Sequence, residues 1–318
     1  MSVFTTLTVN EVRDFLCDFT LDEIIELRGI AAGITNTNYF VITQNNHQQQ
    51  TRYVLTVFEK NTPAELPYFV DLMTHLAHRG VLCPTPIIDK NGVALHQLKG
   101  KPALMVSCLQ GKDIAIASTQ QVQQVARALA QMHDAANDYN APSINQRDRA
   151  WRNKMAKKVM PKLSGTDQQL LQSELDYLHQ IDFNCLPKGV IHGDLFRDNV
   201  LFNNEYLGGF IDFYYACHDV LVYDIAIAMN EWCVHHNGAD IGAWDAEKAE
   251  AFCAAYSEVR CLDAVELAHM NDVLRLAAMR FWLSRLYDFH FPMAGELTHT
   301  KDPNHFKNLL LQHITNQH

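Results

Sequence analysis

The fold is decided by two short segments, residues 189–202 and 207–213, which read Gly-Val-Ile-His-Gly-Asp-Leu-Phe-Arg-Asp-Asn-Val-Leu-Phe and Leu-Gly-Gly-Phe-Ile-Asp-Phe. Both are rich in apolar, β-branched and aromatic residues, and a polar turn separates them, so we expect two paired strands. Asn199 follows Asp194 by five residues, and Asp212 follows Asn199 by thirteen. A hairpin would return Asp212 to the side of Asn199, so the stretch predicts a site built from two carboxylates and a carboxamide.

This spacing suits phosphoryl transfer, in which the protein mainly positions groups and neutralises charge. Asp194 would accept or orient the proton of the acceptor hydroxyl, while Asn199 and Asp212 would supply the hard oxygen ligands that Mg²⁺ prefers. His192 is better placed as a structural residue that bonds the loop backbone. The alternative is a capped turn, where Asp and Asn are common, but the joint spacing with His192 matches a kinase catalytic loop.

The motif resembles the Brenner motif of aminoglycoside-phosphotransferase-like small-molecule kinases, in residues 192–199 and 211–213. Longer strings, at 192–199 and 211–217, 33–39 and 53–59, resemble the homoserine kinase branch of that family. The resemblance extends in order over nearly the whole chain. It implies an α+β, two-lobed protein-kinase-like fold, with a small antiparallel N-terminal sheet, a larger helical lobe, and ATP with Mg²⁺ as cofactors.

The resemblance also implies where the nucleotide binds. Residues 29–38 would form the loop over the phosphates. Thr56 stands where many relatives carry a lysine that holds the phosphates. Lys60 and Arg52 are the two candidates to replace that lysine, and the sequence does not choose between them. The 104–108 run would be the connector whose backbone bonds adenine. The residues assigned to the cofactor on this basis are Gly33, Thr35, Asn36, Asn38, Thr56, Met105 and Ser107.

Other polar residues near the motif have two interpretations each. Arg197 would act in catalysis by holding a carboxylate or phosphate bidentately, or would pair with a neighbouring acid. Asp224 would brace the loop. Residues that would contact the acceptor, with packing as the alternative for most of them, are Tyr214, Asp219, Arg280 and Trp282.

The rest of the chain predicts the two lobes independently of the motif. Strand-like runs at 24–27, 38–43, 53–58, 93–98 and 103–109 surround one helical pattern at 63–79. Helical patterns then cover 118–136, 167–180, 219–234, 246–258, 262–289 and a surface helix at 304–318. We therefore predict a nucleotide-binding lobe at 1–108 and a catalytic, acceptor-binding lobe at 109–318.

Composition narrows the function classes. The chain has 318 residues and a formal net charge of −10, which argues against a binder of nucleic acid phosphates. The 8 cysteines include no Cys-x-x-Cys pair and are expected to be reduced. No apolar run of about 18 residues or signal peptide is present, so we expect a cytoplasmic protein without a membrane span.

Three functions remain open. The first is ATP-dependent phosphorylation of the homoserine hydroxyl, as the resemblance implies, by a monomer or homodimer whose partners are homoserine and ATP. The second keeps the chemistry but takes choline, ethanolamine, methylthioribose or an aminoglycoside as acceptor. The third is a nucleotide-binding regulator without catalysis, which only Thr56 supports.

Overall fold

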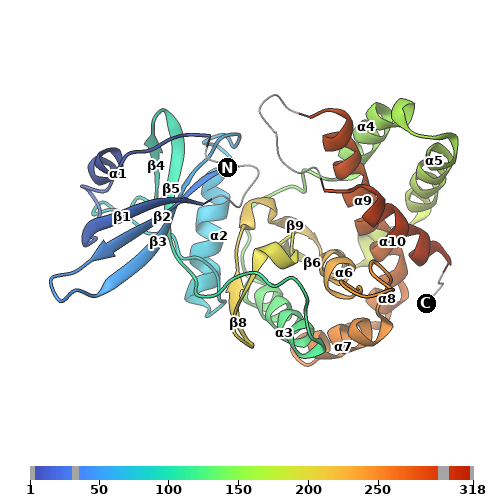
Figure 1. The fold of residues 1–318 in the computed structure, drawn as a ribbon. Coiled ribbons are helices and arrows are strands. Elements are labelled where there is room, and N and C mark those ends of the chain that lie inside the picture. Colours follow the sequence, from blue (N-terminus) through green and yellow to red (C-terminus); the bar gives the residue numbers. More distant parts are fainter. Residues whose placement is uncertain (1–3, 31–35, 293–300, 316–318) are drawn as a thin grey trace. The chain divides into compact units, whose positions relative to one another are not determined.

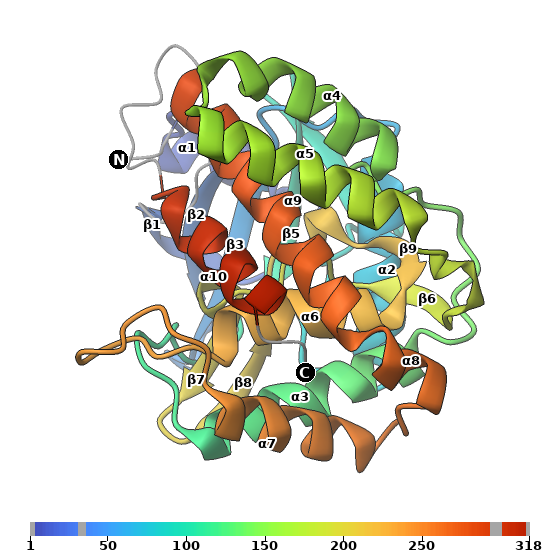
Figure 2. The ribbon, with the colours of Figure 1, turned by 90° about the vertical axis from the view of Figure 1, so that its right-hand side faces the viewer.

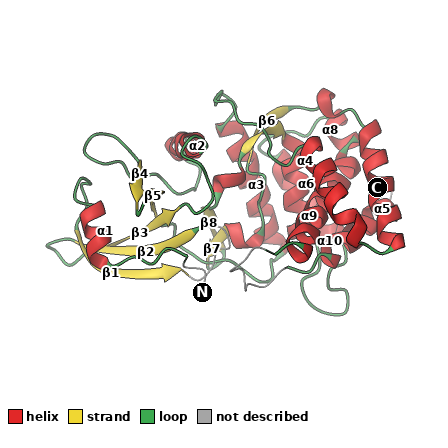
Figure 3. Cartoon of the chain, turned by 90° about the horizontal axis from the view of Figure 1, so that it is seen from above, coloured by secondary structure: helices red, strands yellow, loops and turns green. Residues whose placement is uncertain are grey.

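A computed structural model describes residues 4–30, 36–292 and 301–315 of the chain. It divides into two compact units, Met1–Gln110 and Gly111–His318. The predicted lobe boundary, between residues 108 and 109, lies two residues before this division. The first unit holds the larger sheet and the second is mainly helical (Figure 3), which confirms the predicted α+β fold class.

The first unit is built on a five-stranded antiparallel sheet in the order β1-β2-β3-β5-β4 (Figure 1). Its elements are α1 (Val9–Phe15), β1 (Glu23–Ile30), β2 (Thr37–Gln44), β3 (Gln50–Val57), α2 (Leu66–His78), β4 (Leu95–Leu98) and β5 (Lys101–Ser107). A glutamine-rich turn connects β2 to β3, and Gln44 pairs with Gln50 next to this turn. The helical pattern at 63–79 becomes α2, and Gly80 follows it at φ +81°.

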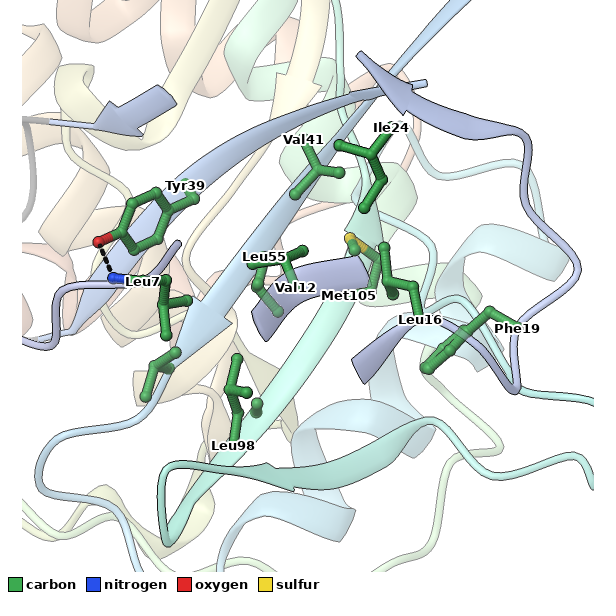
Figure 4. Packing of buried hydrophobic residues seen from close by; sticks show 12 residues of the cluster. Leu7, Val12, Leu16, Phe19, Ile24, Tyr39, Val41, Leu55, Leu98 and Met105 are labelled. Carbon is green, nitrogen blue, oxygen red and sulfur yellow. Dashed lines mark hydrogen bonds between the residues drawn. The ribbon is translucent and has the colours of Figure 1, made fainter. Parts of the chain in front are cut away.

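One face of this sheet is covered by α1. Its N-terminus is a capping box, in which Thr8 and Glu11 exchange hydrogen bonds. Figure 4 shows Val12 of α1 and Leu16, which caps the helix, packed among side chains from all five strands, including Tyr39 and Leu55. Strand residues alternate between faces, so the neighbours of Tyr39 and Leu55 in sequence, Asn38 and Thr56, lie on the opposite face.

The second unit has helix α9 at its centre, packed against α4, α5, α6 and α10 (Figure 2). Its helices are α3 (Thr119–Ala135), α4 (Arg149–Val159), α5 (Gly165–Gln180), α6 (Leu221–Trp232), α7 (Ala246–Ser257), α8 (Ala264–Ala268), α9 (Met270–His290) and α10 (Asn304–Thr315). All 12 residues of α6 are buried, including its polar residues Asp224, Asn230 and Glu231. Over the described ranges, no helix combines the length and the apolar composition that a membrane crossing needs.

Two expectations about these helices need correction. Helix α4 was not predicted, because its sequence carries five cationic side chains and little apolar periodicity. The single helix expected at 262–289 is divided at His269 into α8 and α9. The surface helix expected near the C-terminus is present as α10, and its inner face is buried, with Phe306, Leu309 and Leu310 at 0% exposure.

Two short antiparallel ribbons carry the motif. Strand β6 (Lys188–Ile191) pairs with β9 (Cys217–Val220), and β7 (Val200–Asn203) pairs with β8 (Tyr206–Phe210). The predicted hairpin is therefore formed, with Val200 opposite Phe210. Both ends of the motif are held by these ribbons, which fixes the polar residues between them.

Candidate active site

Residues 192–199, hereafter the active-site loop, connect β6 to β7. The loop is folded on itself by backbone hydrogen bonds, since the N–H of Phe196 donates to the carbonyl of Asp194 at 2.8 Å and the N–H of Asn199 donates to that of Phe196 at 3.0 Å. The amide nitrogen of Asn199 donates to Asp194 twice, to the carbonyl oxygen at 2.8 Å and to Oδ2 at 3.3 Å. Within the described residues, Oδ1 of Asn199 accepts no hydrogen bond, so it is the atom left for a metal ion.

Asp212 returns to the same place through the hairpin. The N–H of Ile211 donates to the carbonyl of Asn199 at 2.9 Å. Asp212 itself has φ +64°, in the left-handed region that short polar side chains tolerate better than most. The chain then turns into a short helix, Phe213–Tyr215, and the backbone N–H of Tyr214 donates to the Asp212 carboxylate. The structure thus brings Asp194, Asn199 and Asp212 together.

The two carboxylates have raised pKa values. Burial raises the pKa of Asp194 to about 6, although the positive charge of Arg280 opposes the rise. Burial and then the negative charge of Asp194 raise the pKa of Asp212 to about 7. The two carboxylates repel each other, and each has few donors to oppose that repulsion. A divalent cation bound by Asn199 and Asp212 would offset this repulsion, so the donor set fits Mg²⁺.

The ligands for such a cation would not all come from side chains. Across the described ranges, no group of three or more His, Cys, Asp or Glu side chains is arranged to hold a metal ion. Mg²⁺ commonly keeps several water or phosphate ligands besides one or two protein oxygens. A site of one carboxylate and one carboxamide is therefore of the kind this ion uses beside a nucleotide.

Behind the active-site loop lies a buried scaffold centred on Asp224. Its Oδ2 accepts from the backbone N–H of His192 at 2.7 Å, and its Oδ1 accepts from that of Gly193 at 2.8 Å. Oδ2 also bonds Nε2 of His133 at 3.1 Å, and Nδ1 of His133 bonds the Tyr256 hydroxyl at 2.7 Å. The His192 ring bonds the Ile211 carbonyl at 3.0 Å. Asp224 and His192 thus hold the backbone around the loop through these hydrogen bonds. The structural roles that the sequence predicts for them stay predictions.

Two arginines predicted at the site have different surroundings. Arg280, on α9, lies with Nη1 3.6 Å from Oδ1 of Asp194. Arg197 instead donates from Nε to Glu231 at 2.8 Å and from a terminal nitrogen to the carbonyl of Ala115. It lines a pocket of about 920 Å³. The structure therefore shows the acid pairing that the sequence left as the alternative for Arg197, and places Arg280 beside Asp194.

The other predicted acceptor residues differ in their surroundings. Tyr214 follows Asp212 by two residues and is partly buried. Asp219 lies in a strand instead of beginning a helix, and its carboxylate accepts from Asn145 Nδ2 at 2.6 Å and from the N–H of Val220 at 2.7 Å. Trp282 is 1% exposed inside the core around α9. It presents almost no surface to a ligand, which favours packing, the alternative that the sequence left open for it.

The residues predicted to bind the nucleotide lie in the first unit, except that Gly33 and Thr35 fall outside the described residues. Asn36 accepts from the N–H of Glu59 at 3.3 Å. Asn38 and Thr56 are register partners on neighbouring strands, and the Thr56 hydroxyl donates to Oδ1 of Asn38 at 2.8 Å. Where a lysine would lie in many relatives, this chain thus has a hydroxyl bonded to an amide.

The assignment of Met105 and Ser107 to adenine is not favoured by their hydrogen bonds. The carbonyl of Met105 accepts from the N–H of Ile87 at 2.8 Å, and the N–H of Ser107 donates to the carbonyl of Thr85 at 2.8 Å. The Met105 side chain faces the α1 side of the sheet and is 0% exposed. These two backbone groups are engaged within the first unit, and the assignment of Met105 and Ser107 to adenine stays a prediction.

Sequence reasoning missed three polar side chains on this side of the molecule, Arg147, Arg152 and Tyr223. Arg147 and Arg152 lie at the start of α4, the helix that was not predicted. Tyr223 sits in the apolar pattern of α6 and reads as a core residue. The only signal was the concentration of arginines at 147, 149 and 152, which by itself resembles a solvated helix face.

Comparison with known proteins agrees with this geometry. The model of a family described as "Phosphotransferase enzyme family" matches residues 26–262. A homoserine kinase of Methylobacillus flagellatus is 49% identical over 99% of this chain and 96% of its own length, and one of Neisseria meningitidis is 46% identical over 98% and 99%.

Solved structures share the fold at low identity. An amicoumacin kinase in complex with AMP-PNP and Ca²⁺ superposes with a TM-score of 0.70 at 15% identity, over 97% of this chain and 92% of that one. A microcompartment-associated aminopropanol kinase gives 0.62 at 16% identity, over 96% and 94%. A spectinomycin phosphotransferase gives 0.65 at 14% identity, over 97% and 95%.

Proposed function

This chain belongs to the phosphotransferase enzyme family, and from that premise we propose that it transfers the γ-phosphoryl group of ATP to the side-chain hydroxyl of L-homoserine. The product would be O-phospho-L-homoserine, an intermediate of threonine biosynthesis. The observation that carries the proposal is the convergence of Asp194, Asn199 and Asp212 in a chain that is 49% identical to a homoserine kinase. We further propose a cytoplasmic enzyme that works as a monomer or homodimer.

In this proposal, Asp194 is the group that faces the acceptor hydroxyl. Its carboxylate is oriented by Asn199 and is charged above a pKa of about 6, so it would accept or direct the hydroxyl proton at neutral pH. Arg280, 3.6 Å away, would hold that carboxylate in its charged form. The scaffold around Asp224 keeps the loop from moving while these contacts are made.

Asn199 and Asp212 are the residues that would hold Mg²⁺. Bound there, the ion would neutralise charge on the transferred phosphoryl group and orient it. Asp212 is suited to this role because its left-handed backbone and the N–H of Tyr214 aim a carboxylate with few donors away from the hairpin. We propose Arg197 as a positioning residue, since its guanidinium is tied to Glu231.

The direct test is the acceptor preference of the purified protein. ATP, Mg²⁺ and one alcohol at a time would be supplied, with homoserine, choline, ethanolamine, methylthioribose and an aminoglycoside as the panel. Mass spectrometry of the acceptor would report its phosphorylated form. We expect turnover with homoserine to exceed that with every other alcohol, and equal or lower turnover with homoserine would refute the substrate assignment.

A further inference from the structure

Three arginines of the second unit, Arg147, Arg152 and Arg280, come together from separate parts of the chain and form what we call the basic cluster. Arg147 precedes α4, Arg152 lies on α4, and Arg280 lies on α9, which packs against α4. The Tyr215 ring lies 5.6 Å from the guanidinium carbons of both Arg147 and Arg280. Arg152 also donates to the carbonyl of Arg147 at 3.3 Å. The cluster therefore begins beside the reacting carboxylate and extends to α4.

Not every arginine of the cluster has a carboxylate at ion-pair distance in the described ranges. Within the described part of the chain, neither Arg147 nor Arg152 forms an ion pair, and only Arg280 has a carboxylate within 4 Å, that of Asp194. Burial lowers the pKa of Arg152, against the pull of Tyr223 and Asp219. Cations withdrawn from water without a partner are costly. An anion bound here would remove that cost.

A buried hydroxyl next to the cluster is also without a partner. Tyr223 is 3% exposed, and among the described residues its hydroxyl has no hydrogen bond. Burial raises the pKa of this phenol to about 12, while Arg280 and Arg152 oppose the rise and Asp219 adds to it. The hydroxyl is therefore within electrostatic reach of both arginines and of Asp219. A phenolic donor left unsatisfied in a protein interior is rare and calls for an explanation.

The dimensions of the acceptor connect these observations. In homoserine, the hydroxyl oxygen and the carboxylate carbon are separated by three carbon atoms, or about 5 Å when extended. Arg280 lies 3.6 Å from Asp194, which the proposed reaction places at the hydroxyl, and the charges of Arg280 and Arg152 both act on the Tyr223 hydroxyl. A single amino-acid alcohol of this length would therefore reach from Asp194, at its hydroxyl, to the arginines, at its carboxylate.

We propose that Arg152, Tyr223 and Arg280 hold the α-carboxylate of the acceptor and so select amino-acid alcohols over amino alcohols. The assignment rests on the proposed function, because it needs an acceptor whose hydroxyl lies at Asp194. The guanidinium groups would donate charge-assisted hydrogen bonds to the carboxylate, and the Tyr223 hydroxyl would donate a third. Asp219, on the same side, would face the α-ammonium group.

The experiment compares homoserine with its two truncated forms. 3-Aminopropan-1-ol lacks only the carboxylate, and 4-hydroxybutanoate lacks only the ammonium group. For the wild-type chain we expect removal of the carboxylate to reduce kcat/KM at least tenfold more than removal of the ammonium group, since two arginines and a phenol lose their partner. Equal losses, or a preference for 3-aminopropan-1-ol, would overturn the assignment.

Two variants then test whether Tyr223 and Arg152 are the residues that bind the carboxylate. Tyr223→Phe removes one oxygen that has no partner, so the fold should keep its thermal stability, and Arg152→Gln removes the unpaired charge. For each we expect the KM for homoserine to rise about tenfold while kcat falls less than threefold, and the KM for 3-aminopropan-1-ol to stay within twofold. A merely structural role would change both acceptors equally, and that result would contradict the proposal.

Matched controls come from the same unit. Arg149→Gln alters a neighbouring arginine on α4 whose guanidinium donates to the carbonyls of Leu178 and His179. Lys301→Gln alters a cation that lines the pocket beside Arg197. Both should leave the KM for homoserine within twofold. A rise in Lys301→Gln and none in Arg152→Gln would put the carboxylate in that pocket and overturn the assignment.

The test separates the two levels of the proposal. If the wild-type chain phosphorylates homoserine and the Tyr223→Phe and Arg152→Gln variants keep its KM, the basic cluster does not bind the carboxylate and the proposed function stands. If the wild-type chain prefers another hydroxy acid and both variants raise its KM, the substrate is wrong and the carboxylate site is right. If it prefers alcohols without a carboxylate, both are wrong.

Discussion

The two sides of the active-site loop contrast sharply in how they treat a carboxylate. Behind the loop, burial alone would raise the pKa of Asp224, yet the hydrogen bond from His133, the nearby imidazoles and the N–H of Gly193 together lower it. In front of the loop, burial raises the pKa of Asp194 to about 6 and that of Asp212 to about 7, because few donors face them. The number of donors around the carboxyl group decides the sign of the shift.

This difference teaches which groups serve the fold and which remain available for chemistry. The lone pairs of Asp224 are used by the two backbone amides and the imidazole that bond it. Asp194 and Asp212 keep theirs for a proton, a metal ion or an acceptor. The same contrast separates Tyr256, whose hydroxyl is bonded, from Tyr223, whose hydroxyl is not.

The largest expected effect is on catalysis and comes from the front of the loop. Asp194→Asn keeps the shape of the side chain but removes the group that takes or directs the proton, so kcat should fall about 10³-fold. Nucleotide affinity, measured by calorimetry, should change less than threefold. A variant that keeps more than a tenth of the wild-type kcat would show that Asp194 is not the reacting carboxylate.

The next effect is on stability and comes from behind the loop. Asp224→Asn places an amide nitrogen against donors that now meet a carboxylate oxygen, which leaves buried groups unsatisfied. We expect the free energy of unfolding, measured in urea, to fall by about 3 kcal/mol. Asp176→Asn, at an exposed position on α5, is the matched control and should change it by less than about 0.5 kcal/mol.

The raised pKa of Asp194 should also make the free energy of unfolding depend on pH. Its folded pKa of about 6 exceeds the unfolded value of 3.8, so between these pH values the folded state holds a proton that the unfolded state has released. Stability is therefore lost as pH rises from 4 to 6, by roughly 3 kcal/mol in total.

The Asp194→Asn variant, measured without added metal, tests whether protonation of Asp194 causes this pH dependence. Asp194→Asn should match the wild type in unfolding free energy near pH 4 and exceed it at pH 7 to 8, in parallel urea titrations. A constant difference across this range would mean that the carboxyl group titrates at its ordinary value in the folded protein.

A smaller effect on stability is expected at Gly193, where the backbone of the active-site loop lies close to the carbonyl of Tyr215. Gly193 has φ +75°, and a Cβ there would lie 2.8 Å from the carbonyl oxygen of Tyr215. Gly193→Ala should lower the unfolding free energy by about 2 kcal/mol and displace Asp194 from its position. Gly165→Ala, at the start of α5 with open space around its Cβ position, should not lower it, and an equal loss in both variants would contradict the steric explanation.

The smallest effect compares the two tyrosines. Tyr256→Phe removes the hydroxyl that bonds His133 and should cost about 1 kcal/mol, because the imidazole loses its partner in a buried network. Tyr223→Phe should cost nothing or stabilise the protein. Thermal unfolding of both variants beside the wild type measures the difference, and a loss in Tyr223→Phe as large as in Tyr256→Phe would show that the Tyr223 hydroxyl is satisfied in the fold.

Much of the fold could be predicted because it depends on local patterns. Alternating apolar residues marked the strands of the first unit, and the hairpin from 200 to 210 followed from two apolar segments around a polar turn. The spacing of Asp194, Asn199 and Asp212 is covalent and could be read directly. Helix α4 could not, since its polar sequence gives little periodicity and its position depends on packing against α9.

By itself, the sequence determined the fold class, the loop that carries the reacting groups and the family to which the chain belongs, because residue spacing along one segment fixes all three. Only the tertiary structure decided which arginine lies beside Asp194, that Trp282 is a core residue, and that the buried Tyr223 hydroxyl bonds none of the described residues. These facts depend on side chains from helices far apart in the chain. Burial and hydrogen-bond satisfaction are properties of that packing, which no local pattern records.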